Sequence, residues 1–179
     1  MINDEHKQFY AFAHYDGALL SLVWIASFLC YLHGLSKPSF MMFAMLLAVS
    51  TPFFAAYRLR KFRDNARGGV IGFFRAYYYI ISMFFNAAIL LGVVQIVYYA
   101  YFDNGYTISR VIEMMNDETN RKLIEANGMT ELFNESLRQM RQMRPFEYMW
   151  NSFPLNVMLG VILGIPIAAV IKRNTPKQQ

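Results

Sequence analysis

The stretch RLRKFRDNARGG, residues 58–69, separates two long apolar runs and carries five bases against one acid, Asp64. The five bases are Arg58, Arg60, Lys61, Arg63 and Arg67. Short loops rich in lysine and arginine stay on the cytoplasmic side of a membrane. The stretch therefore predicts a cytoplasmic basic loop, and this loop orients the apolar runs on either side of it.

The composition of the 179-residue chain is unlike that of an ordinary soluble domain. Hydrophobic residues make up 56% of the chain and charged residues only 16%, whereas soluble domains contain about 25% charged residues. The formal net charge is +5, and many of the bases flank apolar runs. We therefore expect the partners to be the lipid bilayer and its anionic headgroups, and we expect no nucleic-acid partner.

Four apolar runs are long enough to predict membrane spans. They cover about residues 17–33, 40–57, 71–102 and 153–171. The third run would form a helix of roughly 48 Å, so it must tilt or protrude from the bilayer. The predicted organisation has the first three spans in residues 1–102, an insertion in residues 103–151, and the fourth span with a basic tail in residues 152–179. The bases of that tail are Lys172, Arg173 and Lys177.

Residues 103–151 differ from the rest of the chain, because they contain eight acids and six bases and no run apolar enough to span. Apolar residues at helical spacing, with Asp117 and Thr130 as expected N-caps, predict two or three short amphipathic helices. The repeat RQMRQMR supplies candidate outer-surface contacts, namely Arg138, Met140, Arg141, Met143 and Arg144. Two interpretations stay open: a helix that lies on the headgroups, or a methionine surface that binds a peptide.

The predicted fold class is all-α. We expect an integral membrane four-helix bundle with a short helical extracytoplasmic insertion between the third and fourth spans. Four spans place both termini and the basic loop on one side of the membrane, which the positive charges assign to the cytoplasm.

Few polar residues lie inside the predicted spans. Asn86, Gln95 and Asn156 are candidates for contacts between helices. Arg75 lies near the end of the third span, where its guanidinium is expected to reach the headgroups.

Gly160 and Gly164 form a small-xxx-small pattern in the fourth span. The pattern predicts close helix packing within the chain, and a homodimer seam is the alternative. The sequence contains no phosphate-binding glycine loop, no HExxH motif, no paired cysteines and no GxSxG motif. We therefore predict no catalytic residue, no cofactor and no metal site.

Three stretches carry a resemblance to a known family: YRLRKFRDNARGG at 57–69, YYAYFDNG at 98–105 and IEANGMTELFNESLRQM at 124–140. Together with the order of the spans, they resemble an uncharacterised family of small membrane proteins of Gram-negative bacteria, described as a domain of unknown function. The resemblance implies a four-span protein of the bacterial inner membrane. It brings no reaction, ligand or functional residue with it.

Three functions stay open at this point. The leading hypothesis is a non-enzymatic scaffold or accessory subunit whose outer helices contact a partner protein or the membrane surface. The second is a small transporter or channel in which Asn86, Gln95, Asn156 and Arg75 line a polar path. The third is a membrane-embedded lipid-modifying enzyme that holds an anionic headgroup with the arginines of the basic loop.

Overall fold

The computed structural model describes residues 2–175, with side chains from residue 6 onward, so Lys177 of the basic tail lies outside the described residues. The helices of this part are α1 (Ile2–Gly34), α2 (Pro38–Ala66), α3 (Phe73–Tyr101), α4 (Tyr106–Asn116), α5 (Glu118–Ala126), α6 (Thr130–Gln142) and α7 (Pro145–Ile171). Among the described residues, four helices are long and apolar enough to cross a membrane: α1, α2, α3 and α7. The prediction of an all-α membrane bundle is confirmed.

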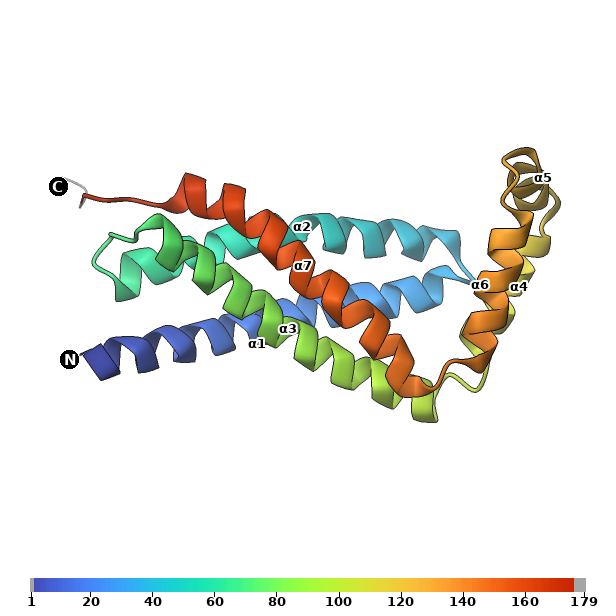
Figure 1. Ribbon diagram of the computed structural model, residues 1–179, viewed down its shortest axis with the longest axis horizontal. Coiled ribbons are helices and arrows are strands. Elements are labelled where there is room, and N and C mark those ends of the chain that lie inside the picture. The colour runs from blue at the N-terminus through green and yellow to red at the C-terminus, as the bar shows by residue number, and fades with distance from the viewer. Residues whose placement is uncertain (1, 176–179) are drawn as a thin grey trace.

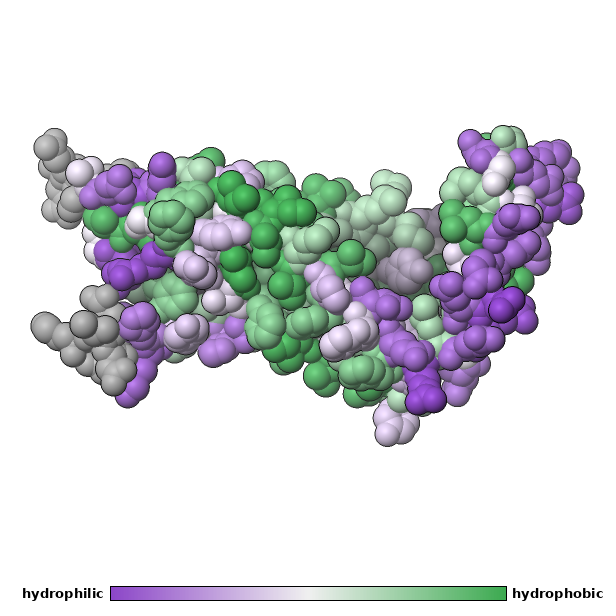
Figure 2. Space-filling view, in the orientation of Figure 1, coloured by the Kyte–Doolittle hydropathy of each residue, from purple (hydrophilic) through white to green (hydrophobic). Residues whose placement is uncertain are grey.

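The four long helices form an elongated bundle, with both chain termini at one end and α4, α5 and α6 across the other (Figure 1). We call these the terminal end and the arm end, and we call α4–α6 the arm. Helix α3 packs against both α1 and α7, whereas α2 packs mainly on α1. A hydrophobic band covers the middle of the bundle, and hydrophilic residues gather at the terminal end and on the arm (Figure 2). This distribution is typical of a multi-pass membrane protein.

The predicted loop over residues 58–69 is wrong for most of its length, because α2 ends only at Ala66. Arg58, Arg60, Lys61 and Arg63 therefore lie in the last turns of a helix, and Arg67 follows it. Arginine and lysine favour helices, so nothing stops α2 before the two glycines. Gly68 and Gly69 then make the turn with φ angles of 60° and 81°, which glycine adopts at little cost.

The first and last spanning helices begin earlier than the apolar runs. Helix α1 continues back to Ile2, and α7 begins at Pro145. Pro145 occupies the first turn of α7, where a missing backbone N–H is tolerated. The backbone N–H of Arg144, the N-cap residue, donates to Glu147 Oε2 at 2.7 Å and so stabilises the first turn of α7.

The arm contains three short helices, in agreement with the predicted two or three. Asp117 caps α5 as expected, because its Oδ1 accepts from the backbone N–H groups of Thr119 at 3.1 Å and Asn120 at 3.3 Å. Thr130 is not the cap of the next helix, since it is the first residue of α6 and Met129 precedes it without a side-chain cap. The turn at Gly128, with φ 64°, brings the chain into helical conformation one residue earlier than expected.

Candidate functional site

Three polar side chains from α1, α2 and α3 meet inside the bundle toward its terminal end. Arg58 Nε donates to Asp16 Oδ1 at 2.8 Å, and the Arg58 Nη2 pairs with the same oxygen. The Tyr79 hydroxyl donates to the other carboxylate oxygen, Oδ2. We call Asp16, Arg58 and Tyr79 the buried triad. It joins three membrane spans at one carboxylate.

Asp16 and Tyr79 of the triad are closed off from lipid and water, and Arg58 is largely so. Asp16 is 1% exposed and Tyr79 is fully buried, while the Arg58 side chain is 12% exposed. Phe62 stacks on the Tyr79 ring with centroids 4.4 Å apart, and the Arg58 guanidinium lies 5.6 Å from the centroid of the Tyr15 ring. A buried charge is tolerated when it is paired and hydrogen-bonded, and Asp16 meets both conditions.

Sequence reasoning included Arg58 only as a loop residue and did not connect Asp16 or Tyr79 with it. A signal was available, because Asp16 lies one residue before an apolar run and an ionisable residue in a span needs a partner. Asp16 and Arg58 lie at similar distances along the chain from the turn between Gly34 and Pro38. Antiparallel packing of α1 and α2 therefore brings them to the same depth.

Arg63 joins the end of α2 to the end of α7. Its Nη1 donates to the Ile171 carbonyl at 2.8 Å, and its Nε donates to Asp64 Oδ1 at 2.7 Å. Ile71 and Arg173 exchange two backbone hydrogen bonds of 3.0 Å beside it. Since the last carbonyls of a helix have no partner within the helix, Arg63 stabilises the end of α7.

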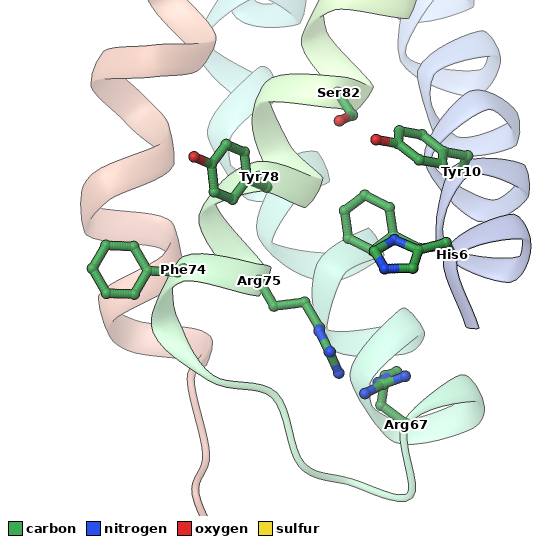
Figure 3. Close-up of a pocket in the computed structure, with 8 residues that line it drawn as sticks. His6, Tyr10, Arg67, Phe74, Arg75, Tyr78 and Ser82 are labelled. Atoms are coloured by element: carbon green, nitrogen blue, oxygen red, sulfur yellow. The ribbon is translucent and has the colours of Figure 1, made fainter. Parts of the chain in front are cut away.

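The other bases of residues 58–69, together with Arg75, fall into two groups. Arg60 and Lys61 are exposed on the surface of α2. Arg67 and Arg75 instead line a cavity of about 480 Å³ between α1, α3 and the end of α2. Its lining also includes His6, Tyr10, Tyr78 and Ser82 (Figure 3).

The polar residues predicted inside the spans include two on α3, Asn86 and Gln95, which make different contacts. Asn86 lies opposite Gly17 of α1, and its side-chain amide donates to the Ser82 carbonyl at 2.6 Å. Gln95 faces α7, where its Oε1 accepts from the Ser152 hydroxyl at 2.7 Å. Asn156 is half-buried on α7. Asn86 and Gln95 thus face different neighbours of α3, and the structure does not bring these two side chains together.

Gly160 and Gly164 lie where α7 packs on α3. A Cβ atom at Gly160 would lie 2.5 Å from the Cβ of Phe84, and one at Gly164 would lie 3.0 Å from the Tyr77 ring. Both glycines are buried within the single chain. They permit the close approach of α3 and α7.

The residues of the RQMRQMR repeat separate onto two sides of the chain. Arg138, Arg141 and Arg144 are exposed, whereas Met140 and Met143 are half-buried. The Tyr148 hydroxyl of α7 donates to the Met140 carbonyl at 3.1 Å. The exposed apolar side chains of the arm lie elsewhere, on α5 and the helix ends beside it: Met114, Leu123, Met129 and Leu132. We call these four residues the arm tip.

The base of the arm is held to the bundle by polar and aromatic contacts. Asp103 Oδ1 accepts from the Thr107 backbone N–H at 3.0 Å, and the hydroxyls of Tyr106 and Ser36 are 2.7 Å apart. Tyr99 of α3 stacks on Tyr148 of α7 with centroids 3.8 Å apart. The arm therefore starts from a defined position on the bundle.

Among the described residues, no group of three or more His, Cys, Asp or Glu side chains could hold a metal ion. Comparison with curated proteins and with solved structures returned no match. A family model described as "Protein of unknown function (DUF4199)" matches residues 15–173. The match includes the buried triad, most of α1, the other three spans and the whole arm. The chain therefore belongs to the DUF4199 family of proteins of unknown function.

Proposed function

We propose that the protein is a non-enzymatic accessory subunit of a bacterial inner membrane, and that it binds a partner membrane protein in the corner between α2 and the arm. Both termini lie in the cytoplasm and the arm lies on the opposite side, since this places the bases of the terminal end on the cytoplasmic side. The observation that carries the proposal is the apolar surface of this corner, which the chain itself leaves uncovered.

One side of the corner is a stripe along α2. Five large side chains at helical spacing are between 61% and 73% exposed: Met42, Met45, Leu46, Val49 and Phe53. We call them the α2 stripe. Helix α2 packs mainly on α1, so the stripe is free to receive a helix from another protein. Apolar packing of this kind holds membrane helices together.

The other side of the corner is the arm tip. The arm crosses the bundle end and carries α5 past the turn between α1 and α2 (Figure 1). The hydrophobic residues of this part of the arm lie on its side toward the spans (Figure 2). Leu123 and Leu132 are 57% and 62% exposed on an arm whose surface is otherwise largely hydrophilic (Figure 2). Exposed apolar residues that gather in such a place are typical of a protein interface.

Charge favours a protein partner over the membrane surface as the occupant of the tip. Glu118, Glu125 and Glu131 are exposed beside the apolar residues of the tip. Glu118 and Glu125 pair with Lys122 and Arg121, but residues 117–131 still contain four acids and only two bases. Anionic headgroups would repel this excess of acids, whereas a protein with basic residues around an apolar contact would attract it.

The test is photo-cross-linking in cells with a photoreactive residue at Val49 or Leu132. Ile162 and Ile165 of α7 are matched controls, since they are 54% and 53% exposed and lie outside the corner. We expect one protein adduct of constant mass from both corner positions and lipid adducts from α7. Lipid adducts alone from all four positions would contradict the proposal, and so would a protein adduct that forms equally well from α7.

A further inference from the structure

We propose that the cavity at the terminal end binds a phospholipid, with its anionic phosphate at Arg67 and Arg75 and its chains along the groove between α1 and α3. The cavity has a volume of about 480 Å³, which is within the range of sites for small ligands. This inference does not depend on the partner proposed above, because the cavity lies at the other end of the bundle.

The cavity follows from the way α1 and α3 cross. The two helices pack closely at Gly17, where an added Cβ would lie 2.7 Å from the Cβ of Asn86 and 2.8 Å from the Met83 carbonyl oxygen. They diverge on either side of this crossing (Figure 1). The divergence leaves the cationic cavity toward the terminal end. It also leaves an apolar groove of about 380 Å³ toward the arm end, which Leu22, Leu90 and Val93 help to line.

The basic side chains of the cavity lie at its mouth. Figure 3 shows the guanidinium groups of Arg67 and Arg75 directed toward one another, with the His6 ring above them. Arg67 comes from the end of α2, Arg75 from the first turn of α3, and His6 from α1. A guanidinium group can donate two parallel hydrogen bonds to the oxygens of a phosphate. Two arginines from different helices are therefore suited to hold a phosphodiester between them.

The polarity of the lining changes with depth in the way a phospholipid requires. The hydroxyls of Tyr10 and Ser82 point toward one another farther into the bundle (Figure 3). Ser82 lies two turns after Arg75 on α3, or about 10 Å along the helix axis. Hydroxyls at this depth can donate to the ester groups that follow a lipid phosphate. Tyr10 and Tyr78 are 52% and 61% exposed, so the lining continues onto the surface that contacts acyl chains.

The experiment measures lipid retention by native mass spectrometry of the whole protein in mild detergent. Phosphatidylglycerol and phosphatidylcholine with the same chains are added to the wild type and to two double variants. Arg67→Gln with Arg75→Gln alters the cavity, and Arg60→Gln with Lys61→Gln removes the same charge from the exposed surface of α2. We expect preferential retention of phosphatidylglycerol by the wild type and a loss of roughly tenfold to a hundredfold in its affinity in the cavity variant only. Equal losses in both variants, or no loss in either, would overturn the proposal.

Two further measurements separate the source of the phosphate and guard against misfolding. An excess of glycerol 3-phosphate should leave the bound phosphatidylglycerol in place. Displacement of the lipid by glycerol 3-phosphate at the same concentration would show that the cavity binds a soluble phosphate ester instead. A phosphatidylglycerol with a photoreactive chain, added to the wild type, should label α1 and α3 on both sides of Gly17. Labelling spread evenly over α2 and α7 would overturn the proposal without any variant.

Discussion

The terminal half of the bundle buries some of its charged residues, whereas α5 and α6 of the arm expose all of theirs. In the terminal half, Asp16, Arg58 and Arg63 are largely buried and each pairs with a residue from the chain. In the arm, ion pairs such as Arg121 with Glu125 and Lys122 with Glu118 join side chains that are more than half exposed. Buried pairs are strongly coupled to the fold, whereas exposed pairs contribute little.

This contrast separates the molecule into a part that carries stability and a part that is open to contact. Helices α5 and α6 have no buried residue among those described, whereas α3 alone buries ten. Substitutions in the triad should therefore affect the whole bundle, and substitutions in the arm should act locally. The following predictions test this difference, from the largest expected effect to the smallest.

The largest effect should come from Asp16→Ala, because it leaves the Arg58 guanidinium buried without its carboxylate. We expect the free energy of unfolding to fall by about 3–5 kcal/mol. Unfolding by sodium dodecyl sulfate in mixed micelles, followed by circular dichroism, measures the loss. The double variant Asp16→Ala with Arg58→Met should recover part of it, since no charge is then left unpaired. A double variant no more stable than Asp16→Ala would contradict this explanation.

Arg63→Met should have the next largest effect, because it removes the side-chain donor to the Ile171 carbonyl. A hydrogen bond to a charged group contributes about 1.5–3 kcal/mol, and the loss should be concentrated at the end of α7. Hydrogen exchange of the amides from 168 to 173 measures it. Arg60→Met is the control, because the Arg60 side chain is 62% exposed. Equal exchange in the two variants would mean that Arg63 does not hold α7.

Gly160→Ala tests the close contact of α7 with α3. The added Cβ would lie 2.5 Å from the Phe84 Cβ, and crowding of this kind costs about 1–3 kcal/mol. Alanine gains up to about 1 kcal/mol in helix propensity, so we expect a net loss of about 1–2 kcal/mol. Gly72→Ala is the control, since nothing lies within 4 Å of a Cβ there. Gly160→Ala as stable as this control would contradict the packing shown here.

The smallest effect on the bundle should come from Asp117→Ala, which removes the cap of α5. Loss of an N-cap destabilises a helix by about 1 kcal/mol, and here the loss should stay within the arm. We expect faster hydrogen exchange in residues 118–126 with no change in the unfolding of the four spans. A shift in the unfolding of the spans would show that the arm is part of the cooperative unit.

Hydrophobic patterning was enough to predict four spans and a helical insertion, because an unbroken apolar run of about 20 residues is typical of a helix that spans a bilayer. It was less informative about helix ends. The bases after Tyr57 look like a loop in a hydropathy pattern, yet arginine and lysine favour helices, and α2 continues to Ala66. The methionines and arginines of RQMRQMR appear together in sequence, but Met140 is half-buried and Arg138 is exposed. Which of them faces the solvent depends on how α6 sits against α4 and α7.

The sequence by itself determined the class of this protein, an α-helical chain that crosses a membrane several times, since the cost of burying backbone polar groups in lipid leaves few other solutions. Only the tertiary structure decided which polar residues matter to one another. Asp16, Arg58 and Tyr79 are far apart in the chain and belong to three spans, so their contact depends on helix packing and not on local spacing. Helix packing also brings Arg67 and Arg75 together with His6. They line one cavity because α1 and α3 diverge from Gly17 toward the terminal end.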